Sequence, residues 1–471
     1  MIPIAEFAGR EVAVFGLARS GLSAAKALAA GGAIVHAWDE GESARAAAEA
    51  EGVPTSDINA RDWRSFAALV LSPGVPLTHP RPHRVVELAR AVGVPIVGDI
   101  ELFARAVNAL PAHARPKIVG VTGTNGKSTT TALIGHILRE SGRDVRVGGN
   151  IGTGVLGLDP LHAGAHYVLE LSSYQLDLTE SLRCAVAVFL NLTPDHLDRH
   201  GDMAGYLAAK KRIFRNQGSG DWAVIGVDDA AGARLCTELN AGALKVAPIS
   251  AGQALSRGVS TLGGRLYDAL TGRAELVLDL ANAVTLPGKH NAQNAAAAYA
   301  ACRGLGLSSR EIANGIATFP GLEHRLELVA TIEGVRFVND SKATNAEATA
   351  QALAVYKRIH WIAGGKAKEG GIETLAAFFP RIAKAYLIGE SAPLFTVALN
   401  GKVSSVQSGT MEKAVAQAFK DARASRDSDA VVLLSPACAS FDQFKDFEAR
   451  GAHFKELVAA LENLVRERAN A

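Results

Sequence analysis

The sequence predicts an α/β protein of three consecutive domains, and three observations support that prediction. The chain has 471 residues, and chains of that length hold roughly three domains. Short apolar runs alternate with stretches whose apolar residues recur at helical spacing. Polar or glycine-rich loops follow many of the apolar runs, as in open parallel sheets, where ligands bind at the carboxyl ends of the strands. We place the domains at 1–110, 111–320 and 321–471 and expect the first and last to be Rossmann-like.

The N-terminal segment opens with a glycine loop between an apolar run and a helical pattern. We predict strands at 11–15, 33–38, 68–71 and 95–97. The loop GLARSG, together with Asp39, resembles the G-x-G-x-x-G fingerprint of dinucleotide-binding folds, but Ala18 stands at the middle glycine. A side chain there hinders close approach of a pyrophosphate, which disfavours an NAD-dependent oxidoreductase. The loop is therefore either a ligand loop or a tight strand-to-helix turn.

A second glycine loop, after the Pro- and Ala-rich linker 108–116, is the most informative stretch of the chain. Residues 119–131 read VGVTGTNGKSTTT, with an apolar run before them and a helical pattern after them. Glycines let backbone N–H groups close around phosphate oxygens, and a helix N-terminus favours negative charge. Val121 replaces the first glycine of the strict P-loop pattern, and the alternative is a glycine-rich turn with a solvated lysine.

The context of this loop favours a P-loop ATPase-type domain. Lys127 would reach the outer phosphates of ATP, and Ser128 would bind Mg²⁺. The predicted ATP-binding residues of the loop are Gly123, Thr124, Asn125, Gly126, Lys127, Ser128 and Thr129.

Two later apolar runs, 167–171 and 185–190, are predicted strands that bring Glu170 and His196 to the same sheet edge. Mg²⁺ prefers oxygen ligands, so Glu170 is a natural partner of Ser128. Each of these residues also has a structural alternative. Glu170 could make an ordinary ion pair, His196 could be a helix-capping or core histidine, and Lys210 could be a solvated helix lysine.

The C-terminal segment repeats the α/β pattern. Two apolar runs flank Glu333-Gly334 and predict a hairpin. Further strands are expected at 359–363, 385–388 and 430–434, and a helix is expected from Thr410. Polar loops at 339–345, 363–371 and 435–451 follow strands, which gives this sheet a ligand edge of its own.

Composition limits the class of protein. The formal net charge is +2 with no basic patch, so we expect no nucleic-acid partner. No apolar run approaches the roughly 18 residues of a membrane span, and no signal sequence is evident. The four cysteines, Cys184, Cys236, Cys302 and Cys438, are far apart, which fits a reducing compartment. We therefore expect a cytoplasmic protein that acts on small molecules, and a monomer.

Taken together, the loops resemble the Mur ligase family along the whole chain and in order. The resemblance rests on GTNGKST, GGNIG, ELSSYQL, NLTPDHLDRH with the downstream AAK, and GKHNAQN. LEHRLE, VNDSKATN and LSPACASFDQFKDFEARGAHF sharpen it toward the branch that adds D-glutamate. The C-terminal signature of diaminopimelate- and lysine-adding relatives is not found. The resemblance implies an N-terminal domain for a uridine nucleotide, a central ATPase domain and a C-terminal domain for the incoming amino acid.

The resemblance also implies a role for individual residues. Catalytic roles fall to Lys127, His196 and Lys210, the last as a carbamylated lysine. The implied Mg²⁺ ligands are Ser128, Glu170, His196 and Lys210. Further ATP contacts are Asn291, Asn294, Arg325 and Asp340. The UDP-linked substrate would contact Asn150, Ser172, Gln175 and His196. D-glutamate would contact His324, Lys342, Thr344, Lys368, Ser440 and Phe447.

The implied reaction is ATP-dependent amide formation in peptidoglycan precursor synthesis. The carboxylate of UDP-N-acetylmuramoyl-L-alanine attacks the γ-phosphate, and the amine of D-glutamate then attacks the acyl phosphate. Two anions must meet, so Lys127 and Mg²⁺ would neutralise charge. The alternatives are a related ligase with another amino acid or a folate substrate, a plain P-loop ATPase or kinase, and a nucleotide-sensing module. A second ligand-edged sheet after the ATP domain argues against a kinase.

Overall fold

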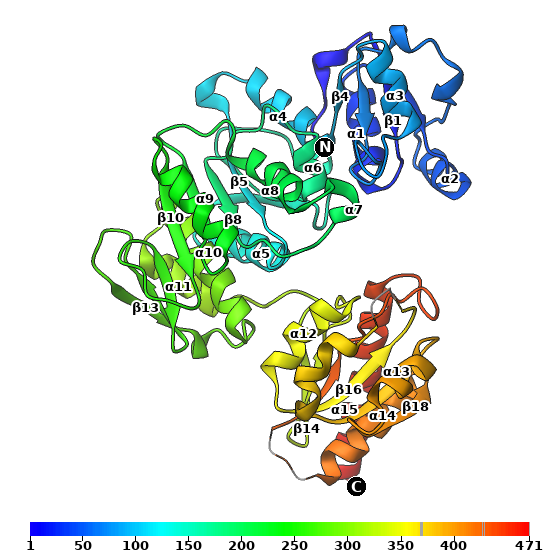
Figure 1. Ribbon diagram of the computed structural model, residues 1–471, viewed down its shortest axis with the longest axis vertical. Helices are drawn as coiled ribbons and strands as arrows, with labels where there is room; N and C mark the ends of the chain where they lie inside the picture. The colour runs from blue at the N-terminus through cyan, green and yellow to red at the C-terminus, as the bar shows by residue number, and fades with distance from the viewer. Residues whose placement is uncertain (368–370, 426, 428, 471) are drawn as a thin grey trace. The chain divides into compact units, whose positions relative to one another are not determined.

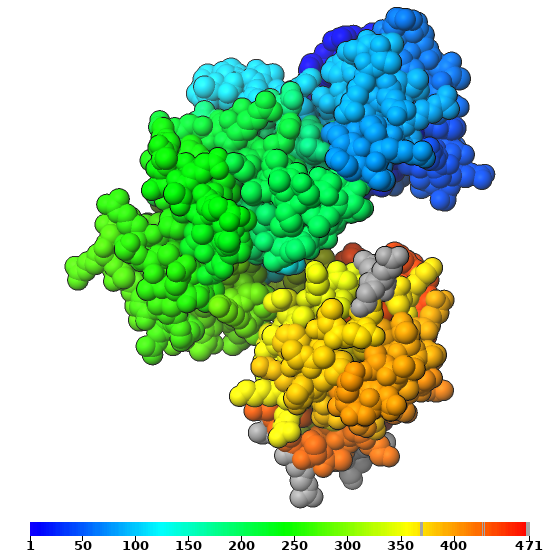
Figure 2. All heavy atoms as spheres, viewed as in Figure 1, coloured from blue at the N-terminus to red at the C-terminus, as the bar shows by residue number. Residues whose placement is uncertain are grey.

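The computed structural model describes residues 1–367, 371–425, 427 and 429–470 and contains three open sheets flanked by helices (Figure 1). This confirms the α/β class. The chain divides into two compact units, 1–283 with 289–319 and 284–288 with 320–471. Side chains fill the space between the ribbons of each unit (Figure 2). The domain limits 1–110, 111–320 and 321–471 stay predictions. In the described part of the chain, no helix combines the length and the apolarity needed to span a membrane.

The N-terminal sheet is wholly parallel and has the order β2-β1-β3-β4. Its strands are β1 (Glu11–Phe15), β2 (Ile34–Trp38), β3 (Leu69–Leu71) and β4 (Ile96–Val97). Its helices are α1 (Arg19–Ala30), α2 (Glu42–Ala50), α3 (Arg84–Ala91) and α4 (Asp99–Ala109). The strand order reverses between β1 and β3, so a crevice is expected beyond the carboxyl ends of these two strands.

The glycine loop after β1 is held by protein groups. Gly16 has a φ of +89°, and a Cβ on Gly21 would lie 1.7 Å from the Gly16 carbonyl oxygen. The Asp39 carboxylate accepts hydrogen bonds from the backbone N–H groups of Leu17 at 2.7 Å and Gly41 at 2.8 Å. Both glycines are therefore required by the turn itself, and Asp39 braces it, which supports the interpretation as a tight strand-to-helix turn.

The central sheet has the order β13-β12-β11-β10-β9-β8-β5-β7-β6. Its strands are β5 (Lys117–Thr122), β6 (Asp144–Gly149), β7 (Ala165–Glu170), β8 (Val186–Phe189), β9 (Trp222–Gly226), β10 (Lys245–Ser250), β11 (Val259–Leu262), β12 (Arg265–Asp268) and β13 (Glu275–Asp279). The pairs β11–β12 and β12–β13 are antiparallel, and the other pairs are parallel. Because β5 lies between β7 and β8, the loops that follow these three strands meet at one edge, as predicted.

Helices cover this sheet and fix its loops. They are α5 (Lys127–Glu140), α6 (Ser173–Asp177), α7 (Leu197–His200), α8 (Met203–Lys211), α9 (Ala230–Asn240), α10 (Lys289–Gly304) and α11 (Ser309–Ala317). The alanine run 295–298 in α10 is fully buried, and α10 packs on α5. Small side chains let the two helices approach closely, and Asn294 in the second turn of α10 lies against Gly126 and Thr130 at the start of α5.

The C-terminal sheet has the order β14-β15-β19-β16-β17-β18. Its strands are β14 (Glu327–Ile332), β15 (Val335–Asn339), β16 (Arg358–Gly364), β17 (Ile382–Ile388), β18 (Ser405–Gly409) and β19 (Ala430–Leu434), with helices α12 (Ala346–Val355), α13 (Ala392–Leu399), α14 (Met411–Ala424) and α15 (Phe447–Asn470). The hairpin β14–β15 is antiparallel as predicted, and Glu333 and Gly334 both have positive φ, as a type I′ hairpin turn requires.

Candidate active site

The phosphate loop joins β5 to α5 as the sequence predicts. Gly123 and Gly126 have φ values of +150° and +84°. A Cβ on Gly126 would lie 2.3 Å from Asn294 Oδ1, and one on Gly123 would lie 2.9 Å from Leu190 Cβ. Only glycine fits at these two positions, because the loop is closed by neighbours and wound into left-handed backbone.

The loop after β8 clamps the phosphate loop. Asn191 Oδ1 accepts the backbone N–H of Asn125 at 2.9 Å, and Asn191 Nδ2 donates to the Asn125 carbonyl at 3.2 Å. The Thr124 hydroxyl donates to the Thr193 carbonyl at 3.2 Å and accepts the Thr193 N–H at 3.0 Å. Sequence reasoning missed Asn191, although its place directly after a buried strand could have drawn attention to it.

Two lysines meet on one carbonyl of this loop. Lys127 Nζ donates to the Gly123 carbonyl at 2.9 Å and to the Thr124 carbonyl at 2.7 Å. Lys210 Nζ, on α8, donates to the same Gly123 carbonyl at 2.8 Å. Lys210 is only 1% exposed, so the interpretation as a solvated lysine is wrong. Burial, followed by the nearby Lys127 charge, holds the pKa of Lys210 well below its usual value. The structure therefore concentrates positive potential where Lys127 and Lys210 were predicted to act.

Glu170 ends β7 with one oxygen unsatisfied. Its side chain is 3% exposed, and Oε1 accepts a hydrogen bond from Asn150 Nδ2 at 2.7 Å. Oε2 is buried and has no hydrogen-bond partner in the described part of the chain, nor does Glu170 make an ion pair there. A buried carboxylate oxygen without a partner is costly, and a bound cation would satisfy it. Together with the Ser128 hydroxyl in the first turn of α5, which follows the neighbouring strand β5, this donor set fits a cation that prefers oxygen, such as Mg²⁺.

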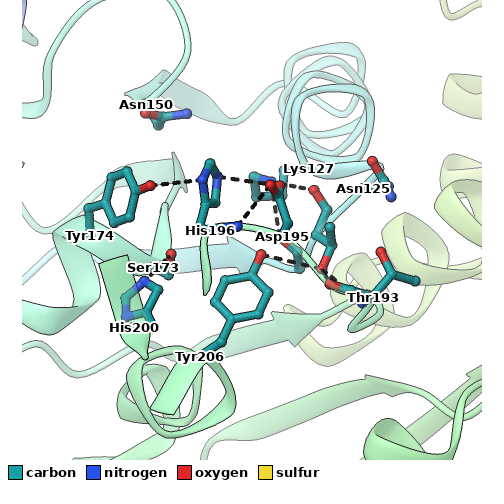
Figure 3. Close-up of polar contacts among 12 residues, drawn as sticks. Asn125, Lys127, Asn150, Ser173, Tyr174, Thr193, Asp195, His196, His200 and Tyr206 are labelled. Carbon is teal, nitrogen blue, oxygen red and sulfur yellow. Dashed lines mark hydrogen bonds and ion pairs between the residues drawn. The ribbon is translucent and has the colours of Figure 1, made fainter. Parts of the chain in front are cut away.

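His196 lies between an aromatic hydroxyl and a carboxylate (Figure 3). Its Nδ1 is 2.8 Å from the Tyr174 hydroxyl, and its Nε2 is 3.3 Å from Asp195 Oδ2. His196 stands at the N-cap position of α7 with a φ of +54°, but its side chain makes no capping hydrogen bond. It is also exposed, so neither the capping nor the core interpretation describes it. Partial desolvation of the ring, opposed by the Asp195 charge, lowers the pKa of the imidazole.

A cavity of about 420 Å³ opens between these residues and the N-terminal sheet. Its walls come from the loops after β1, β3, β6, β7 and β8 and from side chains on α5 and α8. The lining residues are Ala18, Arg19, Ser20, Ser72, Pro73, Gly74, Lys127, Asn150, Ser172, Ser173, Tyr174, His196, Tyr206 and Lys210. The N-terminal part of the wall lies at the β1/β3 crevice. Three of the four residues predicted for the UDP-linked substrate, Asn150, Ser172 and His196, line this cavity.

The fourth, Gln175, lies behind the wall. It is 2% exposed and forms a capping box with Ser172, and its Nε2 donates to Asp99 Oδ2 at 3.3 Å. Gln175 thus supports Ser172, and its contact with a substrate stays a prediction. Arg19, which the sequence did not single out, donates to the carbonyls of Asn150 and Gly152, both at 2.9 Å, and so ties α1 to the loop after β6.

The two asparagines predicted for ATP lie on one face of α10 as expected. Asn294 Nδ2 donates to Asn291 Oδ1 at 3.0 Å, and Asn294 Oδ1 accepts from the Thr130 hydroxyl at 3.2 Å. Both side chains are buried against the phosphate loop and its helix. They buttress the loop, and direct contact with ATP stays a prediction.

In the second unit, three of the residues predicted for D-glutamate lie together. The His324 ring is 6.3 Å from the Phe447 ring, and Lys342 Nζ lies 5.4 Å from the same ring centroid. His324 Nδ1 is 2.9 Å from Asn339 Nδ2. Ser440 is buried and precedes Phe447 by seven residues in the sequence. The Thr344 N–H donates to the Lys342 carbonyl, so these two residues share a turn. Lys368 lies outside the described residues.

Arg450, which sequence reasoning missed, links the loops that carry these residues. Its guanidinium is buried and donates to the Ser341 hydroxyl at 3.0 Å, to the Ser341 carbonyl at 2.9 Å and to the Cys438 carbonyl at 3.1 Å. Burial lowers the pKa of Arg450 to about 10. Arg450 belongs to LSPACASFDQFKDFEARGAHF, one of the stretches that resemble the Mur ligase family. Nothing in the sequence indicated which loops its side chain would join.

Arg325 and Asp340 were predicted for ATP. Asp340 is buried and accepts from the Leu326 N–H at 3.2 Å and from the Ser435 hydroxyl at 2.8 Å. Burial raises the pKa of Asp340 to about 7, against the opposing hydrogen bond from Ser435 and the Arg325 charge. Their contact with a nucleotide stays a prediction.

Comparison with known proteins decides the family. Residues 121–302 match the Mur ligase middle domain, and residues 324–438 match the Mur ligase glutamate ligase domain. A curated UDP-N-acetylmuramoylalanine–D-glutamate ligase from Phenylobacterium zucineum is 63% identical over 462 residues, which is 98% of each chain. The chain belongs to the Mur ligase family. Ligases of the same name from Caulobacter vibrioides and Rhizobium meliloti are 62% and 54% identical, each over 98% of this chain and 98% and 99% of their own.

Solved structures of Mur ligase relatives share the fold. The crystal structure of a UDP-N-acetylmuramate-alanine ligase from Thermotoga maritima has a TM-score of 0.59 at 18% identity and covers 96% of this chain and 99% of that one. A pseudomurein peptide ligase type C from Methanothermus fervidus gives 0.55 at 17% identity, over 96% and 100% of the two chains. At these identities the likeness supports the three-domain α/β architecture alone.

Proposed function

We propose that this Mur ligase adds D-glutamate to UDP-N-acetylmuramoyl-L-alanine with hydrolysis of ATP to ADP and phosphate, in peptidoglycan precursor synthesis. The observation that carries the proposal is the 63% identity, over 98% of both chains, to a UDP-N-acetylmuramoylalanine–D-glutamate ligase. The glycine loop and the two lysines that donate to its Gly123 carbonyl support the proposal, because ATP chemistry needs positive charge beside the phosphates.

The first step joins two anions, and the site is built to reduce their repulsion. A carboxylate oxygen of the substrate bonds to the γ-phosphorus of ATP, and the bond from that phosphorus to the bridging oxygen breaks, releasing ADP. Lys127, at the start of α5, would stabilise the charge that builds on the transferring phosphoryl group. The amine of D-glutamate then attacks the acyl carbon, loses a proton, and phosphate leaves with its oxygen.

Mg²⁺ fits the oxygen donors at this edge of the sheet. We propose that Ser128 and Glu170 hold it, with His196 and Lys210 as further ligands, since Glu170 has a buried oxygen that lacks a partner in the described part of the chain. Bound there, the ion would neutralise phosphate charge. The protein's own residues would carry out the rest of the step. Lys127 would bind phosphate, and the two hydrogen bonds between the Asn191 side chain and the Asn125 backbone would hold the loop in shape.

Lys210 is suited to carbamylation. Burial lowers the pKa of Lys210 and so favours loss of its proton, and the neutral amine is the form that attacks carbon dioxide. The new N–C bond and the loss of one proton give a carbamate whose negative charge would lie near Lys127. The change therefore replaces a repulsive ammonium pair with an attractive one and adds an oxygen ligand for a metal.

The remaining assignments follow from the placement of loops. We propose that the uridine nucleotide binds at the β1/β3 crevice, whose loops line the cavity beside Asn150 and Ser172. D-glutamate would bind at the loops of the second unit that carry His324, Lys342 and Phe447. We further propose a cytoplasmic monomer that binds no nucleic acid.

The test is phosphate release from ATP with UDP-N-acetylmuramoyl-L-alanine and one amino acid at a time. We expect release that requires both the UDP-linked substrate and D-glutamate, with L-glutamate, L-lysine and diaminopimelate near background. Release that another amino acid or a folate supports better would move the protein to another branch of the family. Release without any amino acid would favour a plain ATPase.

A further inference from the structure

One arginine joins the N-terminal sheet to the central site. Arg199 lies on α7, three residues after His196. Its NH1 donates to the Gly74 carbonyl at 2.7 Å, and its NH2 donates to the carbonyls of Val75 at 2.9 Å and Pro73 at 3.3 Å. These carbonyls belong to the loop after β3, two of whose residues, Pro73 and Gly74, line the substrate cavity. A single guanidinium thus holds one wall of the cavity from the opposite side.

The same guanidinium stacks on the Tyr174 ring, and the hydroxyl of Tyr174 contacts His196. The Arg199 Cζ lies 4.5 Å from the Tyr174 ring centroid, and the Tyr174 hydroxyl is 2.8 Å from His196 Nδ1. Figure 3 shows the hydroxyl pointing at the imidazole. Three groups therefore form a continuous series from the Pro73–Val75 loop through Arg199 and Tyr174 to His196.

This use of an arginine is not that of a surface charge. Arg199 makes no ion pair in the described part of the chain, and its Nε is buried there without a hydrogen-bond partner. Its donors are aimed at three neutral backbone carbonyls instead. A planar fork that is rigid and stacks on an aromatic ring can hold a loop in one position, whereas the single flexible ammonium of a lysine cannot reproduce that geometry.

We propose that Arg199 is a positioning residue for the UDP-linked substrate: it fixes the Pro73–Val75 loop in the shape that closes the cavity, and it seats Tyr174 so that its hydroxyl orients His196. The inference rests on the proposed ligase function, because it names the substrate whose binding the loop controls. Loss of Arg199 should loosen the cavity wall first and should leave the phosphate loop in place, because the hydrogen bonds of Arg199 within the described residues go to the Pro73–Val75 loop.

The experiment is steady-state kinetics of Arg199→Met, Arg199→Lys and Tyr174→Phe, with Arg215→Met as the control. Arg215 is a 53% exposed arginine whose nearest acid, Glu180, is 3.9 Å away. We expect Arg199→Met to raise KM for UDP-N-acetylmuramoyl-L-alanine about tenfold or more and to leave KM for ATP within about twofold, because even a misplacement of about 1 Å at a binding site can cost up to about 10²-fold. Calorimetric binding of that substrate without ATP should weaken by the same factor.

The other variants separate positioning from folding. Arg199→Lys keeps the charge and should still raise KM for the UDP-linked substrate. Tyr174→Phe removes the hydroxyl and should lower kcat more than it raises KM. The double variant Arg199→Met/Tyr174→Phe should be less impaired than the product of the single effects, because the two side chains act in series. Arg215→Met should behave as wild type.

Several results would overturn the inference. They are unchanged KM for the UDP-linked substrate in both Arg199 variants, an equal rise in KM for all three substrates, or multiplicative single effects in the double variant. If Arg199→Met does not fold, Arg199→Lys decides the matter by the same criteria. A wild-type enzyme without ligation of D-glutamate would instead refute the proposed function, so the two failures are distinguishable.

Discussion

Two glycine loops of this chain occupy equivalent places in their folds and differ in their electrostatics. GLARSG after β1 and GTNGKS after β5 each join a strand to a helix, and each needs glycine at a left-handed or crowded position. In the first loop a carboxylate of the protein, Asp39, accepts the backbone N–H of Leu17. In the second, the Nζ atoms of Lys127 and Lys210 both donate to the Gly123 carbonyl. The backbone of the first loop thus binds a carboxylate of the protein itself. The second loop has two lysine side chains beside it, as a loop that binds the phosphates of a ligand needs.

The comparison shows that glycine spacing alone does not identify a phosphate site. Glycines permit a tight turn in both loops, but the sign of the charge gathered around the turn decides what it can bind. If this is correct, substitutions in the second loop should act on ATP chemistry, and substitutions in the first should act on stability or on the UDP-linked substrate.

The largest effect is expected at Lys127. Lys127→Ala removes a charge that stabilises the transferring phosphoryl group, and we expect kcat to fall by about 10²–10³-fold or more. Phosphate release would measure the loss, and circular dichroism should show an unchanged fold. The matched control is Lys211→Ala, because Lys211 is partly exposed and pairs with Glu238 at 2.7 Å. Normal turnover of Lys127→Ala would refute the assignment of this loop to ATP.

Lys210 tests whether the second loop needs an added negative charge. We expect incorporation of ¹³C-bicarbonate as a carbamate signal in ¹³C NMR, and loss of that signal together with activity in Lys210→Ala. Acetate or bicarbonate should partly restore the activity of Lys210→Ala by supplying a carboxylate. An unmodified Lys210 in active, Mg²⁺-bound enzyme would contradict this prediction.

The lowered pKa of Lys210 also has a consequence for stability, with a definite sign. A lysine whose pKa is lowered by folding binds fewer protons in the folded state than in the unfolded one, so it makes the unfolding free energy rise with pH. The rise extends from the lowered pKa up to the unfolded value of about 10.4. Unfolding by urea at several pH values without bicarbonate would show it as a difference in slope between wild type and Lys210→Met. Equal slopes would mean that Lys210 titrates normally.

Gly126 tests the shape of the second loop. Gly126→Ala would place a Cβ 2.3 Å from Asn294 Oδ1 and force left-handed backbone on alanine, so we expect kcat/KM for ATP to fall by about 10²-fold. Gly142→Ala is the control, because Gly142 has a similar φ of +72° and, among the described residues beyond its own neighbours in the chain, no atom within 4 Å of an added Cβ. It should cost roughly 1–2 kcal/mol of stability and leave ATP kinetics unchanged. Equal kinetic effects of the two substitutions would contradict the closed loop.

The sequence predicted the strands at the site edge because each combines a buried apolar run with a polar loop. β1 and β19 match their predicted ranges, and β7 and β8 deliver Glu170 and His196 beside β5. Other features depend on residues distant in sequence. The clamp between Asn125 and Asn191 joins positions 66 apart, and the link between Gln175 and Asp99 joins positions 76 apart. No local pattern encodes such pairs, and the partly exposed strands β12 and β13 lack a clear apolar run.

The smallest effect on catalysis is expected at Asp39, and it bears most directly on the comparison. Asp39→Ala leaves the N–H groups of Leu17 and Gly41 without their carboxylate acceptor, which should lower the free energy of unfolding by about 1–3 kcal/mol. Because no phosphate of ATP is assigned to this loop, KM for ATP should stay within about twofold of wild type. Urea unfolding and ATP kinetics on the same preparation would test both statements. Asp39→Asn keeps an oxygen acceptor and should recover part of the stability, which separates the hydrogen bond from the charge. A variant of normal stability with a raised KM for ATP would mean that the first loop serves the nucleotide after all, and the contrast between the two loops would then fail.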